Sequence, residues 1–171
     1  MAVVTTKSGV ITNRDATPRV ANSGALVKGA LKQAIGTLEA VSGDSIGSKY
    51  ILAQIPSNAV GERAKLYCDA ITTCAGDIGI YRTTADGGAV VDVDFYASAQ
   101  SLASALPGTE VQHEADAADA GVGFGNADLE KPLWQRLQLT ADPNVMYDVV
   151  VTLTAAAGSA GTIGLRVQYA E

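Results

Sequence analysis

Residues 163–169, IGLRVQY, decide the fold, because they hold the clearest alternation of apolar and polar side chains in the sequence. Ile163, Leu165 and Val167 fall on one face of an extended strand, and Tyr169 continues that face. Successive side chains of a strand point to opposite sides of the sheet. The stretch therefore predicts a β-strand that buries one face in a core.

The same period of two recurs in residues 148–154, 64–70 and 77–81. Residues 50–55 and 30–39 are expected as two further strands, so the prediction extends to a whole sheet protein. The last also fits a helical stripe, but Gly29 and Gly36 would each weaken that helix by about 1 kcal/mol, so we expect a strand. The glycine-rich link at residues 155–161 predicts a loose hairpin between the last two strands.

Two short helices are expected in the connections. Asp94 is a candidate N-cap for a helix with Phe95, Ala99, Leu102 and Leu106 on one side. Pro132 suits the first position of a second helix, which would carry Leu133, Trp134 and Leu137. Short strands at 89–93 and 108–112 and an exposed loop at 114–128 complete the expectation.

Taken together, these segments predict an all-β protein. We expect an antiparallel β-sandwich, and the number of strands and short turns favours a jelly roll. At 171 residues the chain holds one domain with an appendage. Its composition agrees, since 47% of the residues are apolar but only 5% are aromatic. We expect an extended arm at residues 1–28 and the sandwich at residues 29–171.

The charges are divided unequally along the chain. Residues 1–38 carry one acid, Asp15, and five basic side chains, a net charge of +4, whereas residues 39–171 carry seven basic and seventeen acidic side chains, a net charge of −10. The basic side chains of the first part are Lys7, Arg14, Arg19, Lys28 and Lys32. The first part is also too apolar for a freely solvated tail. A basic, apolar arm on an acidic body indicates docking onto a larger partner through these five residues.

Composition and sequence pattern also exclude several partners. A total charge of −6 argues against nucleic acid as the main partner. No apolar run approaches the ~20 residues needed to cross a bilayer, and the start lacks the regions of a signal peptide. We therefore expect no membrane association and synthesis in a cytoplasm.

Candidate residues for chemistry are few. Cys68 and Cys74 are expected as reduced thiols, with a disulfide between them as the alternative. His113 is the sole histidine and is expected at the surface, and no nucleophile motif accompanies it. The acids between residues 83 and 130 are expected to form a solvated face, with a weak Ca²⁺ site as the alternative. The glycine run 121–125 lacks a phosphate-loop spacing. We expect no catalytic residue, no cofactor and no metal site.

Trp134 has two interpretations. A single tryptophan beside leucines is most simply a core residue, and the alternative is an aromatic residue at an interface.

The amino-acid sequence resembles that of the jelly-roll cement, or decoration, proteins of tailed bacteriophages over nearly the whole chain. The stretches that carry this resemblance are 5–8 with 11–13, 43–48, 55–59, 68–73, 77–81, 87–92, 95–102 and 130–134. The resemblance implies a jelly roll on the exterior of the capsid that bridges subunits of the major capsid protein. It also implies a homodimer or homotrimer without catalytic residues.

The functional hypothesis is a non-enzymatic virion protein that stabilises a capsid and is made in the bacterial cytoplasm. Two alternatives remain open. One is another virion component of the tail or fibre. The other is a carbohydrate-binding adhesion module, for which Trp134, Tyr96 and Phe124 are the candidate aromatic residues.

Overall fold

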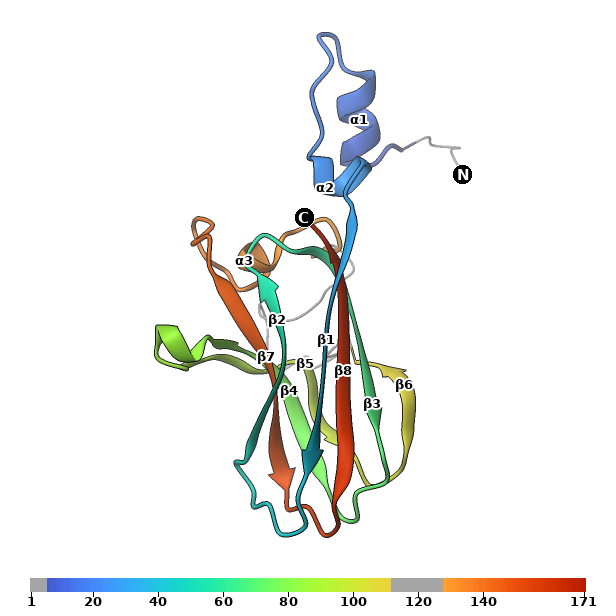
Figure 1. The fold of residues 1–171 in the computed structure, drawn as a ribbon. Helices are drawn as coiled ribbons and strands as arrows, with labels where there is room; N and C mark the ends of the chain where they lie inside the picture. Colours follow the sequence, from blue (N-terminus) through green and yellow to red (C-terminus); the bar gives the residue numbers. More distant parts are fainter. Residues whose placement is uncertain (1–5, 112–127) are drawn as a thin grey trace, which may run out of the picture.

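The computed structural model describes residues 6–111 and 128–171, which form two packed antiparallel sheets (Figure 1). The first sheet contains, in spatial order, β1 (Leu31–Ala40), β8 (Gly161–Ala170), β3 (Val60–Cys68) and β6 (Leu106–Glu110). The second contains β2 (Lys49–Pro56), β7 (Met146–Ala155), β4 (Ala75–Arg82) and β5 (Val90–Ser101). The order 1-8-3-6 against 2-7-4-5 is that of an eight-stranded jelly roll. The predicted all-β sandwich is confirmed.

The core lies between the two sheets and is supplied mainly by the alternating strands. In β8, Ile163, Leu165 and Val167 are at most 1% exposed, as the period of two predicts. Segment 30–39 is also a strand, β1, and the helical alternative is wrong. Burial on β7 exceeds the prediction, because Asp148 and Val150 on its second face are buried too. That strand is central, so it has neighbours on both edges.

Residues 155–161 do not form the expected hairpin. This link carries the chain from β7 in the second sheet to β8 in the first, where β8 pairs with β1 and β3. Alternation reports which face of a strand is buried but not which strand lies beside it. A glycine-rich link of this length serves a crossing between sheets as well as a hairpin.

The helix expected after Asp94 is also wrong. Residues up to Ser101 belong to β5, and Leu106 begins β6. The pairing of β5 with β4 is irregular, since Ile78 faces Ala97 but Ile80 faces Asp92. Such bulges shift the buried positions out of a strict period of two. The apolar side chains of β5 therefore mimic helical spacing. By contrast, α3 (Leu133–Arg136) confirms the second helix, although Pro132 is its N-cap residue and not its first helical residue.

Residues 6–28 are not a continuous extended arm. They contain two short helices, α1 (Gly9–Asp15) and α2 (Gly24–Val27), and lie beyond one end of the sheets (Figure 1). A 3-10 turn, η1 (Thr84–Asp86), occupies the glycine-containing turn between β4 and β5. Within the described part of the chain, no helix is both long and apolar enough to cross a membrane.

The loop between β1 and β2 is closed by one carboxylate. Asp44 Oδ2 accepts hydrogen bonds from the Val41 backbone N–H at 2.9 Å and from the Tyr50 hydroxyl at 2.6 Å. The bond from Tyr50, followed by that from Val41, holds the pKa of Asp44 below its ordinary value of 3.8. Asp44 is therefore charged in the folded protein over the whole neutral range.

Because the pKa of Asp44 is depressed by folding, its contribution to stability is present above pH 4 and is lost as the pH falls through the lower, folded-state value. We expect Asp44→Asn to destabilise the protein at pH 7 and to cost progressively less below about pH 4. Urea unfolding of both proteins at a series of pH values measures this difference. A gap that stays constant down to pH 2 would show that the carboxylate charge contributes nothing.

Candidate docking surface on the N-terminal lobe

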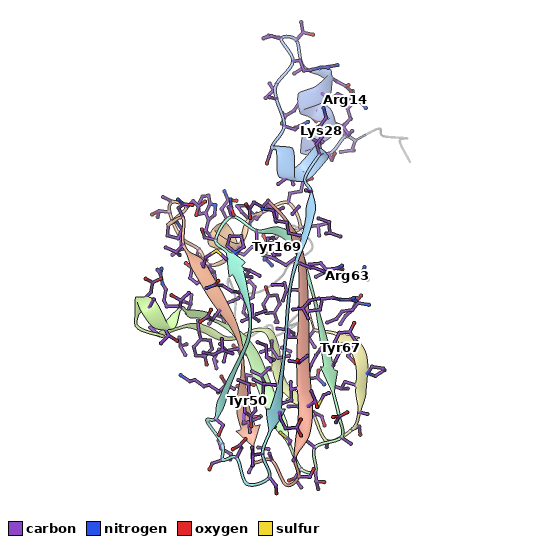
Figure 2. The ribbon with its side chains drawn as sticks, viewed as in Figure 1. Arg14, Lys28, Tyr50, Arg63, Tyr67 and Tyr169 are labelled. Atoms are coloured by element: carbon purple, nitrogen blue, oxygen red, sulfur yellow. The ribbon has the colours of Figure 1, made fainter. Side chains whose placement is uncertain are left out.

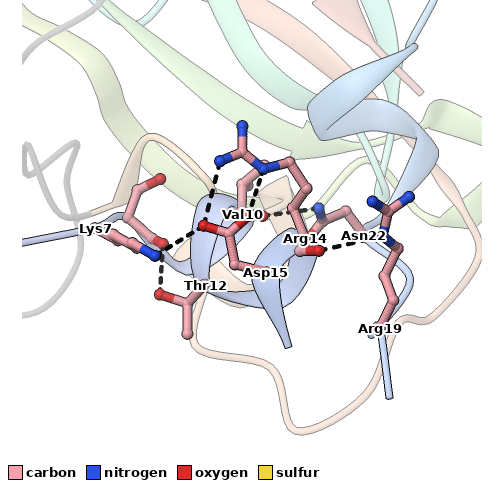
Figure 3. A network of polar contacts seen from close by, with 8 residues as sticks. Lys7, Val10, Thr12, Arg14, Asp15, Arg19 and Asn22 are labelled. Carbon is pink, nitrogen blue, oxygen red and sulfur yellow. Dashed lines mark hydrogen bonds and ion pairs between the residues drawn. The ribbon is translucent and has the colours of Figure 1, made fainter. Parts of the chain in front are cut away.

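Residues 7–28, which we call the N-terminal lobe, are held together by their own hydrogen bonds. The Asn22 side-chain amide donates to the Val10 carbonyl at 3.0 Å (Figure 3). The Asn13 side-chain amide donates to Asn22 Oδ1 at 3.0 Å. Arg19 Nε donates to the Arg14 carbonyl at 3.1 Å. These bonds fold residues 19–22 back along α1, so the lobe has a defined shape of its own.

The lobe is positively charged, and its single acid is already neutralised. Asp15 accepts from Lys7 at 2.8 Å and from Arg14 at 2.8 Å (Figure 3). The bond with Arg14, and then that with Lys7, lowers the pKa of the Asp15 carboxyl. Arg19 and Lys28 add two further positive charges, so residues 7–28 carry a net charge of +3.

A shallow apolar groove of about 360 Å³ runs across the lobe. Its lining includes Val10, Val20 and Val27, and the two arginines Arg14 and Arg19 also border it. Val20 is 50% exposed and Val27 is 47% exposed. A groove lined by aliphatic side chains and two arginines suits an apolar segment that carries carboxylates.

The five predicted contact residues do not all meet. Lys7, Arg14 and Arg19 share the lobe, and Lys28 follows α2 as its C-cap. Arg14 and Lys28 both lie beyond the end of the sandwich in Figure 2. Lys32 lies on β1 and forms an ion pair with Glu171 at 2.7 Å. The structure thus divides the set into four residues on the lobe and one on the sandwich.

Trp134 is half-buried, on α3. It lines a second groove, of about 530 Å³, between α2 of the lobe and the end of the sandwich, together with Pro132 and Glu130. Its backbone N–H donates to the Ser57 carbonyl at 2.9 Å, which fixes the helix against the β2–β3 turn. Its position therefore combines features of both interpretations, with one part packed and one part facing a groove.

An ion pair that the sequence analysis did not predict anchors α3 to β3. Arg136 on α3 contacts Glu62 on β3, and both side chains are at most 1% exposed. The Arg136 guanidinium also stacks over the Phe95 ring, 5.0 Å from its centroid. Burial lowers the pKa of Arg136 to about 10, so the group stays charged at neutral pH. A signal was available, since Glu62 falls on the inward face of the alternation that continues through Ala64 and Leu66.

The candidate residues for chemistry that the structure describes lie in the sandwich. Cys68 and Cys74 are free, buried thiols, and burial raises the pKa of Cys68 to about 11, so it is not a thiolate at neutral pH. Asp92 and Asp94 both lie on β5. Among the described residues no cluster of His, Cys, Asp and Glu could hold a metal ion. His113 and the glycine run 121–125 lie outside the described residues.

One aromatic candidate for sugar binding is ruled out. Tyr96 is 2% exposed and packs edge-to-face against Phe95, with the ring centroids 5.0 Å apart. A ring buried in the core cannot stack on a sugar. Phe124 lies outside the described residues.

Comparison with known proteins gives a likeness at the level of the fold. No family model matches the chain, and no curated protein matches it. A chain of the solved structure described as "Cyanophage Pam1 capsid asymmetric unit" superposes with a TM-score of 0.55 at 14% sequence identity. The alignment covers 89% of this chain and 92% of that one, so the two chains are similar in length. At this identity the likeness establishes a shared jelly-roll architecture.

Proposed function

We propose that this chain is a non-enzymatic structural protein of a phage virion that binds the outside of the assembled major capsid protein lattice as a cement protein. The observation that carries the proposal is the N-terminal lobe, which presents an apolar groove and a net positive charge beyond the end of an acidic jelly roll. The fold likeness to a chain of a cyanophage capsid asymmetric unit supports it.

The proposed mechanism is purely physical. The lobe docks on an acidic surface of the capsid, where charge complementarity sets orientation and speeds encounter. A protein that binds only the assembled lattice stabilises that lattice by mass action. Many copies on one shell add their contributions, so each contact can be weak. The acidic sandwich faces outward and keeps the particles apart.

Neutralising the lobe should weaken binding. We expect Arg14→Gln with Arg19→Gln to reduce occupancy on heads of the parent phage that lack the protein, most strongly at low salt, because screening already weakens the attraction at high salt. Deletion of residues 1–28 should abolish binding. Co-sedimentation with heads at several salt concentrations measures both effects.

The matched control removes two positive charges from the sandwich instead. Arg63 and Lys131 are exposed and form surface ion pairs with Glu110 and Asp128, so Arg63→Gln with Lys131→Gln makes the same change in net charge. Equal loss in both double variants would mean that overall charge, and not the lobe, drives binding. Full occupancy after deletion of residues 1–28 would exclude the lobe altogether.

A further inference from the structure

The outer face of the first sheet carries a cluster of basic side chains. On β3, Arg63, Lys65 and Tyr67 alternate with buried residues, so they point away from the core. On β8, Arg166 and Gln168 alternate with buried residues in the same way. The register places Arg166 directly opposite Lys65, and Gln168 directly opposite Arg63. Arg63 and Tyr67 lie along β3 in Figure 2. We call the surface formed by these five residues the basic face.

The basic face is an exception on an acidic sandwich. The described residues of the sandwich, 29–111 and 128–171, carry eight basic and fourteen acidic side chains. Three of those eight basic side chains lie on this one face. Like charges directly opposite one another on neighbouring strands are destabilising, and Lys65 and Arg166 form such a pair. A bound anion would relieve this repulsion, so the pair indicates a binding surface.

One carboxylate already contacts this face and shows how its arginines bind. Glu110 on β6 lies opposite Lys65, and its Oε1 accepts hydrogen bonds from Arg63 Nε, at 2.8 Å, and from a terminal guanidinium nitrogen of the same residue. The same oxygen is 3.6 Å from Lys65 Nζ. The bond from Arg63 is the main cause that lowers the pKa of Glu110, so this carboxylate is charged at neutral pH. A single negative charge therefore serves a cluster of three positive charges.

Arg166 has the same donors as Arg63 but no carboxylate. Within residues 6–111 and 128–171 it forms no ion pair, and its Nε is buried without a hydrogen-bond partner. Its guanidinium lies over the Tyr67 ring, 5.7 Å from the centroid. That ring packs over Gly108, where an added Cβ atom would come within 2.8 Å of it. Arg166 is thus held in place with donors that the described protein does not use, which suits a carboxylate from outside.

The other side chains around Arg166 favour a carbohydrate chain as the source of that carboxylate. The centre of a protein interface is depleted of charge, whereas here the cations lie on the two central strands and the exposed aliphatic Ile35 lies on the edge strand β1. Gln33 on β1 lies opposite Gln168, and amide groups both donate and accept, as sugar hydroxyls do. We propose that the basic face binds an acidic polysaccharide, whose carboxylates pair with Arg166 while its hydroxyls bond to the glutamines.

Two other anionic partners fit the basic face less well. Proteins that bind single-stranded nucleic acid stack successive bases on several aromatic rings, and of the five residues of the basic face only Tyr67 is aromatic. A capsid surface is the partner proposed for the lobe, which lies beyond the end of the sandwich, whereas the basic face lies along its side (Figure 1). A chain held by its lobe leaves this face open, so the proposal does not rest on the function proposed for the lobe.

The test is binding of the full chain to polygalacturonate, a polysaccharide with a carboxylate on its sugar units. Isothermal titration calorimetry should show binding at about 50 mM salt that weakens at about 500 mM, because the contact is between charges. Arg63→Gln with Arg166→Gln should weaken binding by about tenfold or more at the lower salt concentration, the loss expected for one charge-assisted hydrogen bond. Thermal unfolding verifies that this variant is folded. Arg63→Gln alone changes an exposed side chain and should give part of the loss, so the test does not depend on Arg166→Gln.

Matched controls separate the basic face from overall charge. Lys49→Gln with Arg82→Gln removes two positive charges from β2 and β4 of the second sheet and should bind polygalacturonate like the wild type. Arg14→Gln with Arg19→Gln removes two from the lobe and should do the same. Pullulan, a neutral polysaccharide, should not bind, and polyglutamate and single-stranded DNA should bind more weakly than polygalacturonate.

Four results would overturn the proposal. The first is a wild-type chain that does not bind polygalacturonate at the lower salt concentration, and the second is an equal loss of binding in the control variants. The third is equally strong binding of polyglutamate or DNA, which would assign the basic face to an acidic protein or to nucleic acid. The fourth is loss of head binding in the variant of Arg63 and Arg166, which would assign the face to the capsid.

Discussion

Replacing Arg136 by methionine should lower the free energy of unfolding by about 3 to 5 kcal/mol, the usual cost of removing one partner of a buried ion pair. The variant leaves the Glu62 carboxylate at a site where its side chain is fully buried. Solvation of a lone charge there is too poor to compensate. Urea unfolding at pH 7 measures the loss. Because Arg136 fixes α3, the variant should also loosen the groove that Trp134 lines.

Two comparisons separate the stranded charge from simple loss of packing. The double variant Glu62→Leu with Arg136→Met removes both charges and should recover most of the lost stability, because apolar replacements of a buried pair are often neutral or stabilising. Lys131→Met breaks the exposed pair with Asp128 and should cost less than about 1 kcal/mol. A double variant as unstable as Arg136→Met alone would contradict the role assigned to the pair.

Gly36→Ala should destabilise the protein by about 3 kcal/mol, the upper end of the usual range for overpacked sites. A Cβ atom on Gly36 would overlap the carbonyl group of Leu52, where β2 passes close to β1. Backbone atoms cannot rotate away as a side chain can, so the two strands must separate. Leu52 lies at the register irregularity of β2, and this fixes the position of its carbonyl. Thermal unfolding monitored by circular dichroism measures the loss.

The control for this substitution is Gly24→Ala. A Cβ atom at Gly24 would have no neighbour within 4 Å, and the residue lies at the start of α2. Alanine is the better helix former, so this change should be neutral or stabilising by up to about 1 kcal/mol. If both variants behave alike, the contact between β1 and β2 is not as tight as the structure shows.

The strands of the sandwich were predictable because burial imposes a period of two, as in Ile163, Leu165 and Val167. Their assignment to two sheets was not, because β8 pairs with β1, whose Leu31 faces Ala170 from the far end of the chain. Local pattern carries no information about such distant partners. The bulges of β5 led to the wrong prediction of a helix after Asp94, since they gave strand residues a helical spacing.

The candidate site shows the same division. The positive charge of the first residues could be predicted from the sequence. Helix α1 could not, because its sequence GVITNRD contains three consecutive β-branched residues that disfavour a helix. Bonds from Asn22 and Arg19, outside the helix, hold it together. Glu62 stood out on an inward face, but nothing in the sequence pointed to Arg136 as its partner.

The hydrogen bonds of the Asn13 and Asn22 side-chain amides, which join Asn13 to Asn22 and Asn22 to Val10, have a kinetic consequence. An N-terminal segment that folds only on contact with its partner must reach its bound conformation during each collision. The N-terminal lobe is already folded and can bind in one step, so its association rate is governed by diffusion and by the attraction between opposite charges. Under the proposed function, a capsid would then be coated as quickly as copies of the protein reach it.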